Sequence, residues 1–331
     1  MAVAPRLAIL RVMLVPVLAV LAVAACFRSD VPEVCLGFVA TFSGEDFRSG
    51  RDALEAARFA VDQAVEHGRP AIGGRACRIR LLVRDDLGSP EEAAKVVREL
   101  ATREHVTAVI GPYSSGLADA AAKAAEAVGV PLVTPSATAA VVTAGRPHIF
   151  RIAFTDAFQG MVLGRLAVRE LGLHRVSVVA NADNLASRSL AEAFGQAFTA
   201  CGGEVSLLTY PDRDRDFRPL LRQALAKDPQ ALFLPNPNKE VVLQGLAARS
   251  LGFTGALFGG DSWNGPEVSS LSAFKGAVFV DHWREDAPGE TSKAYAVAFR
   301  KALKRPATEL GALTQDAVDV VLDAVAQAGS I

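Results

Sequence analysis

Small hydroxyl residues gather at two points where an apolar segment of the sequence ends. "VTAVIG" is followed by "PYSSG", with Ser114 and Ser115, and "VPLVT" is followed by "PSAT", with Ser136, Ala137 and Thr138. Each cluster precedes residues with helical periodicity, so hydroxyl groups and the free N–H groups of a helix start converge there. Such an arrangement favours an anion, and a carboxylate is the ligand that both clusters predict.

A simpler explanation exists for each cluster taken alone. Serine is a common N-cap residue, so Ser114 or Ser115 would serve only to begin a helix, and Thr155 with Asp156 would do the same in "FTDAFQG". Two hydroxyl clusters at the ends of adjacent strands are harder to explain as caps than one. We therefore expect the two clusters to bind a ligand together.

The elements that must position these residues alternate between strand and helix. Residues 34–40 read as a buried strand, 51–68 as a helix, 77–86 as a strand and 89–104 as a helix that Ser89 caps. "VTAVIG", a further helix and "VPLVT" follow. This order implies a parallel sheet with helices on both faces.

The alternation breaks at "IFRIAFT" and then restarts. A helix from about residue 156 to 171 leads to the strand "RVSVVAN", and three further helix–strand pairs end in "EVSLLTY", "QALFLPN" and "GALFGGD". The segment "GAVFVDHW" and two helical patterns close the chain. The second run predicts another doubly wound unit.

Two doubly wound parallel-sheet units in one chain predict an α/β protein of two lobes joined by a short hinge. We expect an N-terminal lobe from residues 34–151 plus about 283–331, and a C-terminal lobe from 152–282. Short extended chain near 150–153 and 280–283 supplies the crossings that a hinge needs. In open α/β sheets ligands bind beyond the carboxyl ends of the strands, where the hydroxyl clusters stand.

The first 25 residues read as a signal peptide. Arg6 and Arg11 flank the start of an apolar run that is too short to be a membrane span, and the run ends in "VAAC" at Cys26. This ending resembles the bacterial lipobox, which implies lipidation at Cys26 and anchoring at the periplasmic or cell surface. An ordinary signal peptide with an incidental cysteine is the alternative.

Composition narrows the remaining choices. The net charge is −1 without a basic stripe, which disfavours nucleic acid as a partner. Scattered histidines and the lack of a CxxC pair predict neither a metal site nor a cofactor. Cys35 and Cys77 stand near the starts of two strands that should be neighbours, so they form either a disulfide, allowed after export, or two free buried thiols.

Catalytic motifs are missing from the sequence. There is no G-x-S-x-G, P-loop or H-E-x-x-H motif, and the first strand is followed by "GFVATFSGEDFRSG" rather than a G-x-G-x-x-G loop. A carboxylate without a partnered base or nucleophile performs no reaction. Binding is therefore favoured over catalysis.

Four segments together resemble one family. "VIGPYSSG", "GVPLVTPSAT", "FRIAFTDAFQG" and "FGGDSWNGPEV", in this order, are similar to the leucine/isoleucine/valine-binding family of type I periplasmic binding proteins, over about residues 34–329. The resemblance implies a monomer that captures an amino acid or related small carboxylate in an interlobe cleft by hinge closure and docks on the membrane permease of an ABC transporter. A sensor that signals to a membrane receptor is the alternative.

The resemblance also implies roles for individual residues. Ser115 and Thr138 match the positions that hold the ligand carboxylate, and Ser136 matches one whose backbone carbonyl meets the ammonium. Asp261 matches the acid that faces the ammonium from the other lobe, although an Asp after Gly-Gly also suits a turn. Asp156 and Gln159 are expected at the hinge or the cleft edge.

The expected side-chain pocket departs from the family pattern. Aromatic positions fall at Ser49, Ala186 and near Asn238, which leaves Trp263, Phe47 and Tyr113 as nearby substitutes. A wall rich in polar residues remains, made by Asn181, Asp183, Asn184, Asn236 and Asn238. We expect a polar or larger ligand that still carries a carboxylate. The family usually continues into a third crossing, which is absent after "QAGSI", so we expect a looser hinge or an exposed lobe edge.

Overall fold

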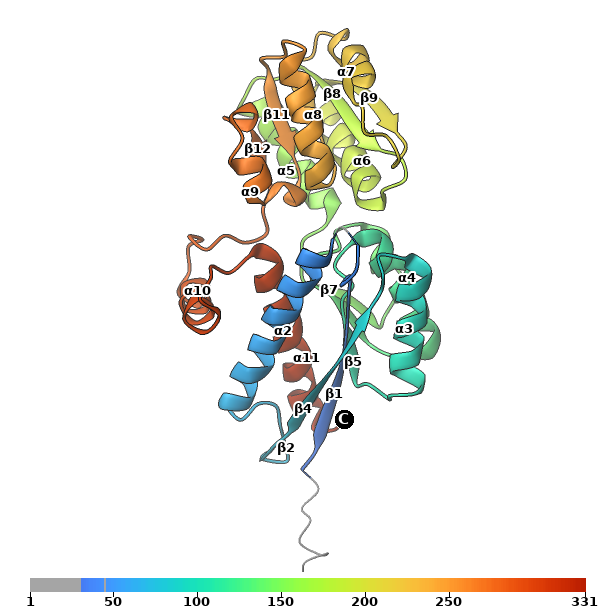
Figure 1. The fold of residues 1–331 in the computed structure, drawn as a ribbon, viewed down its shortest axis with the longest axis vertical. Coiled ribbons are helices and arrows are strands. Elements are labelled where there is room, and N and C mark those ends of the chain that lie inside the picture. The colour runs from blue at the N-terminus through green and yellow to red at the C-terminus, as the bar shows by residue number, and fades with distance from the viewer. Residues whose placement is uncertain (1–30, 45) are drawn as a thin grey trace, which may run out of the picture.

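The computed structural model describes residues 31–44 and 46–331 and shows two α/β lobes stacked along the long axis (Figure 1). Each lobe contains a five-stranded sheet whose strands are all parallel, which is the fold class that the strand–helix alternation predicts. The predicted signal peptide and Cys26 lie outside the described residues. Within the described part, no helix is long and apolar enough to cross a bilayer.

The first lobe is built on a sheet with strand order β4-β1-β5-β6-β7. The strands are β1 (Glu33–Ala40), β4 (Arg78–Asp85), β5 (Ala108–Ile110), β6 (Leu132–Thr134) and β7 (Ile149–Arg151). All but the first residue of β1 are buried, because this strand lies inside the sheet and both of its faces are covered. The hydroxyl clusters follow β5 and β6, which are neighbours in the sheet, so they meet at one edge.

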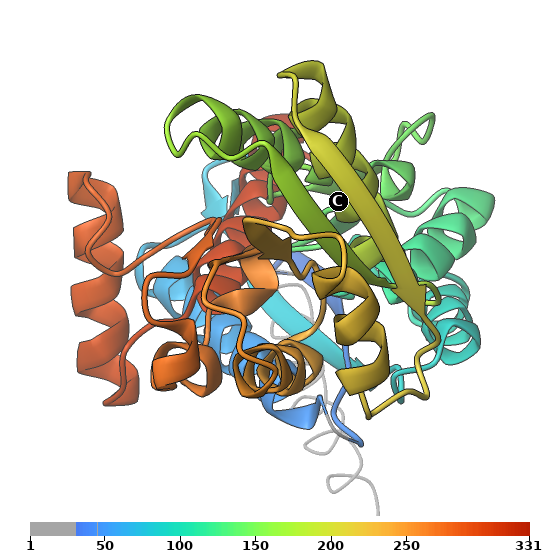
Figure 2. The ribbon, with the colours of Figure 1, turned by 90° about the horizontal axis from the view of Figure 1, so that it is seen from above.

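Helices cover both faces of this sheet. α2 (Phe47–Glu66) and α11 (Glu309–Ala328) pack on one face, and α3 (Pro90–Thr102) and α4 (Ser115–Val128) on the other. α10 (Glu290–Leu303) stands beside α2 in Figures 1 and 2 and is held by an edge-to-face contact of Phe299 with Phe59, at 5.4 Å between ring centres. As predicted, Ser89 caps α3, accepting from the Glu92 N–H at 3.3 Å.

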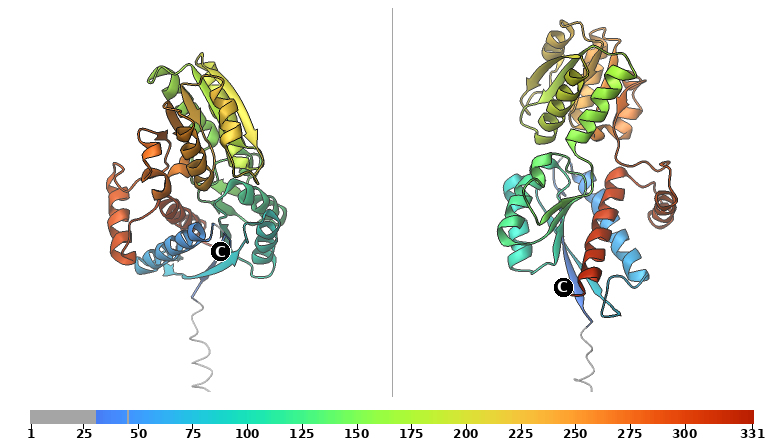
Figure 3. Two further views of the ribbon diagram at one scale, coloured as in Figure 1. Left: turned by 45° about the horizontal axis from the view of Figure 1, so that its top comes forward. Right: turned by 180° about the vertical axis from the view of Figure 1, so that it is seen from behind.

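The second lobe repeats the plan with strand order β12-β11-β10-β8-β9. Its strands are β8 (Arg175–Asn181), β9 (Glu204–Tyr210), β10 (Ala231–Phe233), β11 (Ala256–Gly259) and β12 (Val278–Phe279). α5 (Asp156–Arg169) and α6 (Leu185–Ala200) cover one face, and α7 (Arg218–Leu225) and α8 (Asn238–Ser250) the other. Figure 3 shows the chain passing between the lobes after β7 and again after β12.

Two details of the first lobe differ from the sequence prediction. α2 begins at Phe47, so residues expected in a loop form its first turn. A short hairpin of β2 (Ala71–Ile72) and β3 (Arg75–Ala76) precedes β4. Its strands have two residues each, too few for a periodic pattern to reveal.

Of the two alternatives left open for Cys35 and Cys77, the disulfide is wrong and both are free buried thiols. β1 and β4 are neighbours, but Cys35 pairs in register with Arg80, which places Cys77 roughly 10 Å away along the strand direction. The two side chains also belong to different core layers, on opposite faces of the sheet. A disulfide needs Cα atoms within about 7 Å, so this register excludes it.

Gly160 in "TDAFQG" permits the close packing of α5 on α6. A Cβ atom at this position would lie 2.5 Å from the backbone of Ala193 and Phe194. Gly164, one turn later, faces Ala197 in the same way, at 2.8 Å. The glycine therefore serves the packing of the second lobe rather than the hinge itself.

Replacing Gly160 by Ala should destabilise the protein by about 1–3 kcal/mol, because a backbone atom cannot yield to the added methyl group. Gly195→Ala in α6 is the matched control, since its Cβ would meet nothing closer than 3.9 Å and alanine favours a helix. Urea unfolding of both variants measures the difference. Equal stability of the two would contradict the packing account.

Thiol titration of the unfolded, unreduced protein checks the cysteine assignment. Cys35→Ala should lower the number of reactive thiols by one relative to the wild type, because Cys35 is free. Were Cys35 bonded to Cys77, the same substitution would release a partner and raise the number by one. Cys201→Ala, which removes a further free thiol, calibrates the assay.

Candidate functional site between the lobes

The two predicted hydroxyl clusters form one structure at the edge of the first sheet. The Ser115 Oγ accepts from the backbone N–H groups of Thr138 and Ala139, both at 3.2 Å. Ser114 occupies the N-cap position of α4 but makes no capping hydrogen bond with its side chain. Neither serine therefore caps α4, and the first-turn N–H groups of this helix receive no hydrogen bond from the Ser114 side chain. We call the start of α4 and the loop 134–139 the anion cup.

Hydroxyl groups also fix the shape of the anion cup. Thr134 donates its hydroxyl to the Pro112 carbonyl at 2.6 Å, and Ser136 donates to the Tyr113 carbonyl at 3.1 Å. Ala137 is buried and its N–H donates to the Thr134 hydroxyl at 3.4 Å. The Ser136 hydroxyl and the Ala137 N–H are therefore used within the loop rather than offered to a ligand.

Arg151 supports the anion cup from behind, a role that the sequence analysis missed. Its guanidinium donates to the carbonyls of Ala137 and Ala139, each at 2.9 Å, and also to the Thr143 hydroxyl. Five N–H donors in a planar fork suit an arginine to several carbonyls at once. The only signal in the sequence was a cation at the end of the strand "IFR".

The second lobe begins directly against the anion cup. The Asp156 N–H donates to the Thr138 carbonyl at 3.0 Å, and Thr155 caps α5 by accepting from Phe158 at 3.3 Å, as one reading of the sequence predicted. The Asp156 side chain is 1% exposed, and its carboxylate oxygens have no hydrogen-bond partner among the described residues. Burial raises the pKa of Asp156 to about 6. The hydroxyl groups of Ser189 and Thr138 lie close enough to oppose this shift, although neither forms a regular hydrogen bond with the carboxylate.

Gln159 and Asp261 meet one turn along α5. The Gln159 Nε2 donates to the Asp261 Oδ1 at 3.0 Å, and the Asp261 N–H donates back to the Gln159 Oε1 at 3.3 Å. Burial raises the pKa of Asp261. The acid is therefore held in place by a side chain near the hinge and does more than form a turn.

His282 and Glu309 extend this group and were missed by the sequence analysis. The His282 Nδ1 lies 2.5 Å from Glu309 Oε1, at the start of α11, and 3.9 Å from Asp261 Oδ2. Its ring stacks on Phe154 with 3.8 Å between centres, so the two crossings touch. Burial lowers the pKa of His282, but the hydrogen bond to Glu309 and the nearby negative charges outweigh it and raise the pKa overall.

A cleft of about 1040 Å³ opens between the lobes beside this group. The starts of α2, α8 and α11 and the segment 281–286 line it, and Ser49 and Asn238 are part of its wall, as predicted residues of the side-chain pocket. Acidic lining residues are Asp46, Asp52, Glu267, Asp281, Glu285, Asp286 and Glu309, and basic ones are Arg48, Lys239 and Arg284. Ser114, Ser115, Thr138 and Asp261 are not among the residues that line this space.

Two expected pocket residues do not present a side chain to the cleft. Trp263 lies at the cleft wall but has no exposed surface, because its indole packs in the core of the second lobe and donates to the Leu234 carbonyl at 3.0 Å. Ala186 does not line the cleft. It lies in the first turn of α6 next to Leu185, which packs against the core of the first lobe.

The expected polar wall is largely internal. Asn181 and Asn236 are buried and satisfied within the lobe: the Asn236 Oδ1 accepts from the Asn181 N–H at 3.0 Å, and its amide donates to the Val179 carbonyl at 2.7 Å. Asn184 caps α6, and the Asp183 carboxylate accepts from the Asp212 N–H at 3.0 Å. Asn238 alone of the five predicted residues lines the cleft.

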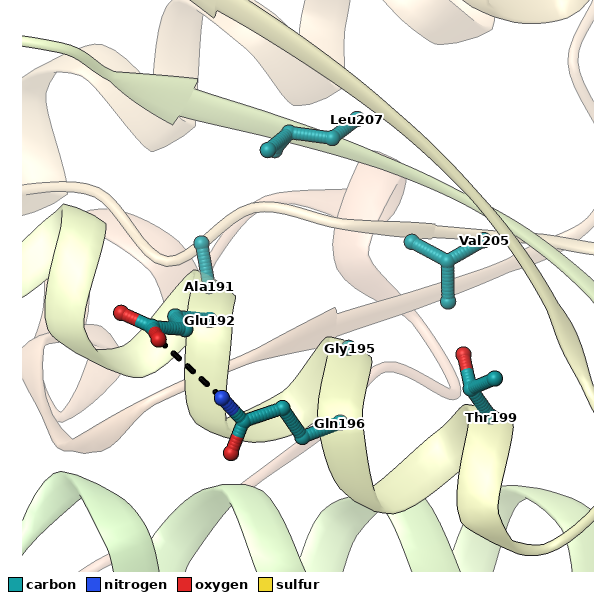
Figure 4. Close-up of a pocket in the computed structure, with 7 residues that line it drawn as sticks. All are labelled: Ala191, Glu192, Gly195, Gln196, Thr199, Val205 and Leu207. Carbon is teal, nitrogen blue, oxygen red and sulfur yellow. Dashed lines mark hydrogen bonds between the residues drawn. The ribbon is translucent and has the colours of Figure 1, made fainter.

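A shallower groove of about 460 Å³ lies on the outer surface of the second lobe, between α6 and β9 (Figure 4). Its polar side chains include Glu192 and Gln196, which bond to each other at 3.0 Å. None of the predicted site residues lines it. The interlobe cleft, whose lining residue Glu309 contacts the His282 that faces Asp261, is the better candidate.

Two parallel-sheet lobes, double crossings and a polar interlobe cleft define a two-lobed solute-binding protein. The chain belongs to the periplasmic binding protein family, whose model matches residues 33–331, and to its leucine/isoleucine/valine-binding, type I branch. It is 24% identical to the Leu/Ile/Val-binding protein BraC3 of Rhizobium johnstonii, over 90% of this chain and 80% of that protein. Membership of this family implies an exported, periplasmic location.

Solved structures agree with this assignment. The leucine-binding protein LivK of Thermotoga maritima superposes with a TM-score of 0.83 at 30% identity, covering 90% of this chain and 84% of that one. The branched-chain amino acid transporter substrate-binding protein LivJ of Streptococcus pneumoniae, in complex with isoleucine, gives 0.79 at 28% identity, covering 88% and 84%.

The buried Asp156 predicts a pH-dependent stability. Its pKa is raised from 3.8 to about 6 in the folded protein, so ionisation opposes folding: the penalty is absent below pH 3.8 and complete above pH 6. Asp156→Asn should therefore gain up to about 3 kcal/mol relative to the wild type as the pH rises across this window. Urea unfolding of both proteins between pH 4 and pH 7 measures this gain, and a pH-independent difference would contradict it.

Proposed function

We propose that this protein is the extracytoplasmic solute-binding component of an ABC transporter and captures an amino acid or a related small carboxylate between its lobes. The observation that carries the proposal is the continuous contact from Ser115 through Thr138 and Asp156 to Gln159 and Asp261. It connects a set of N–H and hydroxyl groups in one lobe to a carboxylate in the other. A ligand with an anionic and a cationic group suits this arrangement.

The ligand carboxylate binds first at the anion cup. There the start of α4 offers N–H groups and the positive end of a helix dipole, and Thr138 offers its hydroxyl. Ser115 keeps the cup assembled by accepting from the backbone of the loop 134–139. The cup belongs to the first lobe, so this step needs no ligand contact from the second lobe.

Closure then adds the contacts of the second lobe. Asp261 meets the ligand ammonium, with its orientation fixed by Gln159. These contacts exist only in the closed form, so the ligand shifts the equilibrium between open and closed by its differential affinity. The stacked pair Phe154 and His282 lies where the two crossings touch, and we assign the pivot to it.

The closed protein docks on the permease in the membrane and releases its cargo there. Lipidation at Cys26 would hold the protein at the membrane surface, near its partner. The proposal assigns no catalytic step to the site, since an anion cup facing a carboxylate provides charge complementarity and no activated nucleophile. The residues of this site bind, orient and release the ligand.

Thr138→Ala should weaken ligand binding at least about tenfold without unfolding the protein, because it removes a hydrogen bond to a charged group. Calorimetry with leucine, glutamine, arginine and benzoate identifies the tightest ligand for the comparison. Thr199→Ala on the outer surface of α6 is the matched control and should bind like the wild type.

Two results would contradict this proposal. If the panel contains no ligand, capture of an amino acid or related carboxylate fails as a whole. If a ligand binds Thr138→Ala and the wild type equally well while thermal unfolding is unchanged, the anion cup is wrongly assigned.

A further inference from the structure

The wall of the interlobe cleft is negatively charged beyond what its own cations balance. Asp46, Glu267 and Asp281 line the cleft and make no ion pair with any residue in the described part of the chain. The lining Arg284 is already engaged by Asp286, at 2.6 Å. A cleft lined by one sign of charge concentrates counter-ions, so this space favours a cation.

The charge is concentrated at the base of the cleft, where Asp281 and Glu309 come together. A single amide, the Asn264 Nδ2, donates to both carboxylates, at 3.0 Å to Asp281 and 3.2 Å to Glu309. Burial and the charge of Glu309 raise the pKa of Asp281 to about 7. The nearest cationic side chain is the imidazole of His282, which contacts Glu309 and also faces Asp261, so two carboxylates already share its charge.

An uncharged side chain of the cleft wall, Asn238, also has a hydrogen-bond acceptor that no described residue uses. The Asn238 Oδ1 is buried at the cleft and has no partner among the described residues. It comes from the second lobe, at the start of α8, whereas Glu309 comes from the first. Residues that carry acceptor oxygens therefore line the cleft from both lobes.

A leucine-like side chain would fit this wall poorly. Closing the lobes over an apolar group would remove water from Asp46, Glu267 and Asp281 without giving these carboxylates a charged partner, which costs free energy. An ammonium or guanidinium group would supply the donors and the charge that the wall lacks. The predicted side-chain positions Ser49 and Asn238 line this same space, so the far end of a ligand enters it.

We propose that the ligand carries a positive charge at the end remote from its carboxylate, and that Asp281 and Glu309 select it. The ligand class is an amino acid or related carboxylate with an ammonium or guanidinium side chain. This inference rests on the proposed function, because it uses the anion cup to orient the ligand. It adds a specificity-determining pair distinct from Asp261, although Glu309 is linked to Asp261 through His282.

Matched pairs of amino acids isolate the charge from the shape. Arginine and citrulline are nearly isosteric, but only arginine carries a charge on its side chain. Lysine and norleucine both have an unbranched side chain, but only that of lysine ends in a charge. By calorimetry we expect the charged member of the better-binding pair to bind at least about tenfold more tightly, which is the effect of a charged hydrogen bond. The preference for the charged ligand should decrease as the salt concentration is raised, although less than it would for a solvent-exposed ion pair.

Asp281→Asn tests the residue assignment. It should reduce the charged-over-neutral preference several-fold, while retained binding of norleucine or citrulline shows that the variant is folded. Glu192→Gln, in the groove between α6 and β9, is the control: it removes one carboxylate charge away from the cleft and should keep the wild-type preference.

The outcomes separate this inference from the proposed function. Tight binding of leucine, citrulline or benzoate with weak binding of arginine and lysine overturns the cationic preference and leaves the binding function standing. An unchanged preference in Asp281→Asn overturns the role of that residue. Absence of binding by every amino acid and by benzoate overturns both.

Discussion

The hydrogen bond from the Asp156 N–H to the Thr138 carbonyl joins the start of the second lobe to the anion cup. It places the first turn of α5 against the anion cup, so that Gln159, one turn later, reaches Asp261. The glycine at position 160 allows α5 to pack closely against α6. We therefore expect the second lobe to move together with α5 as a unit. This backbone contact at the hinge therefore helps to set the position of Asp261 relative to the anion cup.

The hinge gathers more ionisable groups than a passive connection needs. Asp156, Asp261, His282 and Glu309 come from segments far apart in the sequence and meet where the chain crosses. Their burial makes each charge sensitive to its neighbours, because a low-dielectric surrounding weakens screening. For this reason, we expect the charge of the ligand and the position of the lobes to affect the protonation of these hinge residues, and the reverse.

The sequence allowed the fold and the anion cup to be predicted because both depend on local patterns. Alternating strands and helices give parallel sheets, and parallel strands bring their carboxyl ends to one edge, so hydroxyl clusters after β5 and β6 had to meet. Short elements such as β2 and β3 lack enough residues for a pattern. The register that separates Cys35 from Cys77 likewise depends on pairing, which no local signal reveals.

The walls of the cleft could not be predicted in the same way. An asparagine suits a ligand wall and an internal network equally well, and only the tertiary contacts show that Asn181 and Asn236 bond to each other. Trp263 lies beside the cleft, but its side chain is fully buried in the core of the second lobe. Arg151, His282 and Glu309 act through partners that are distant in sequence, so spacing carried no sign of them.

A crystal structure of the protein purified with whatever small molecule it retains tests the central claim most directly. The account predicts that the carboxylate of this molecule lies at the start of α4, bonded to Thr138, with Asp261 facing its cationic group from the other lobe. A ligand that binds elsewhere, such as the groove between α6 and β9, or one that turns an uncharged group toward Thr138, would contradict it.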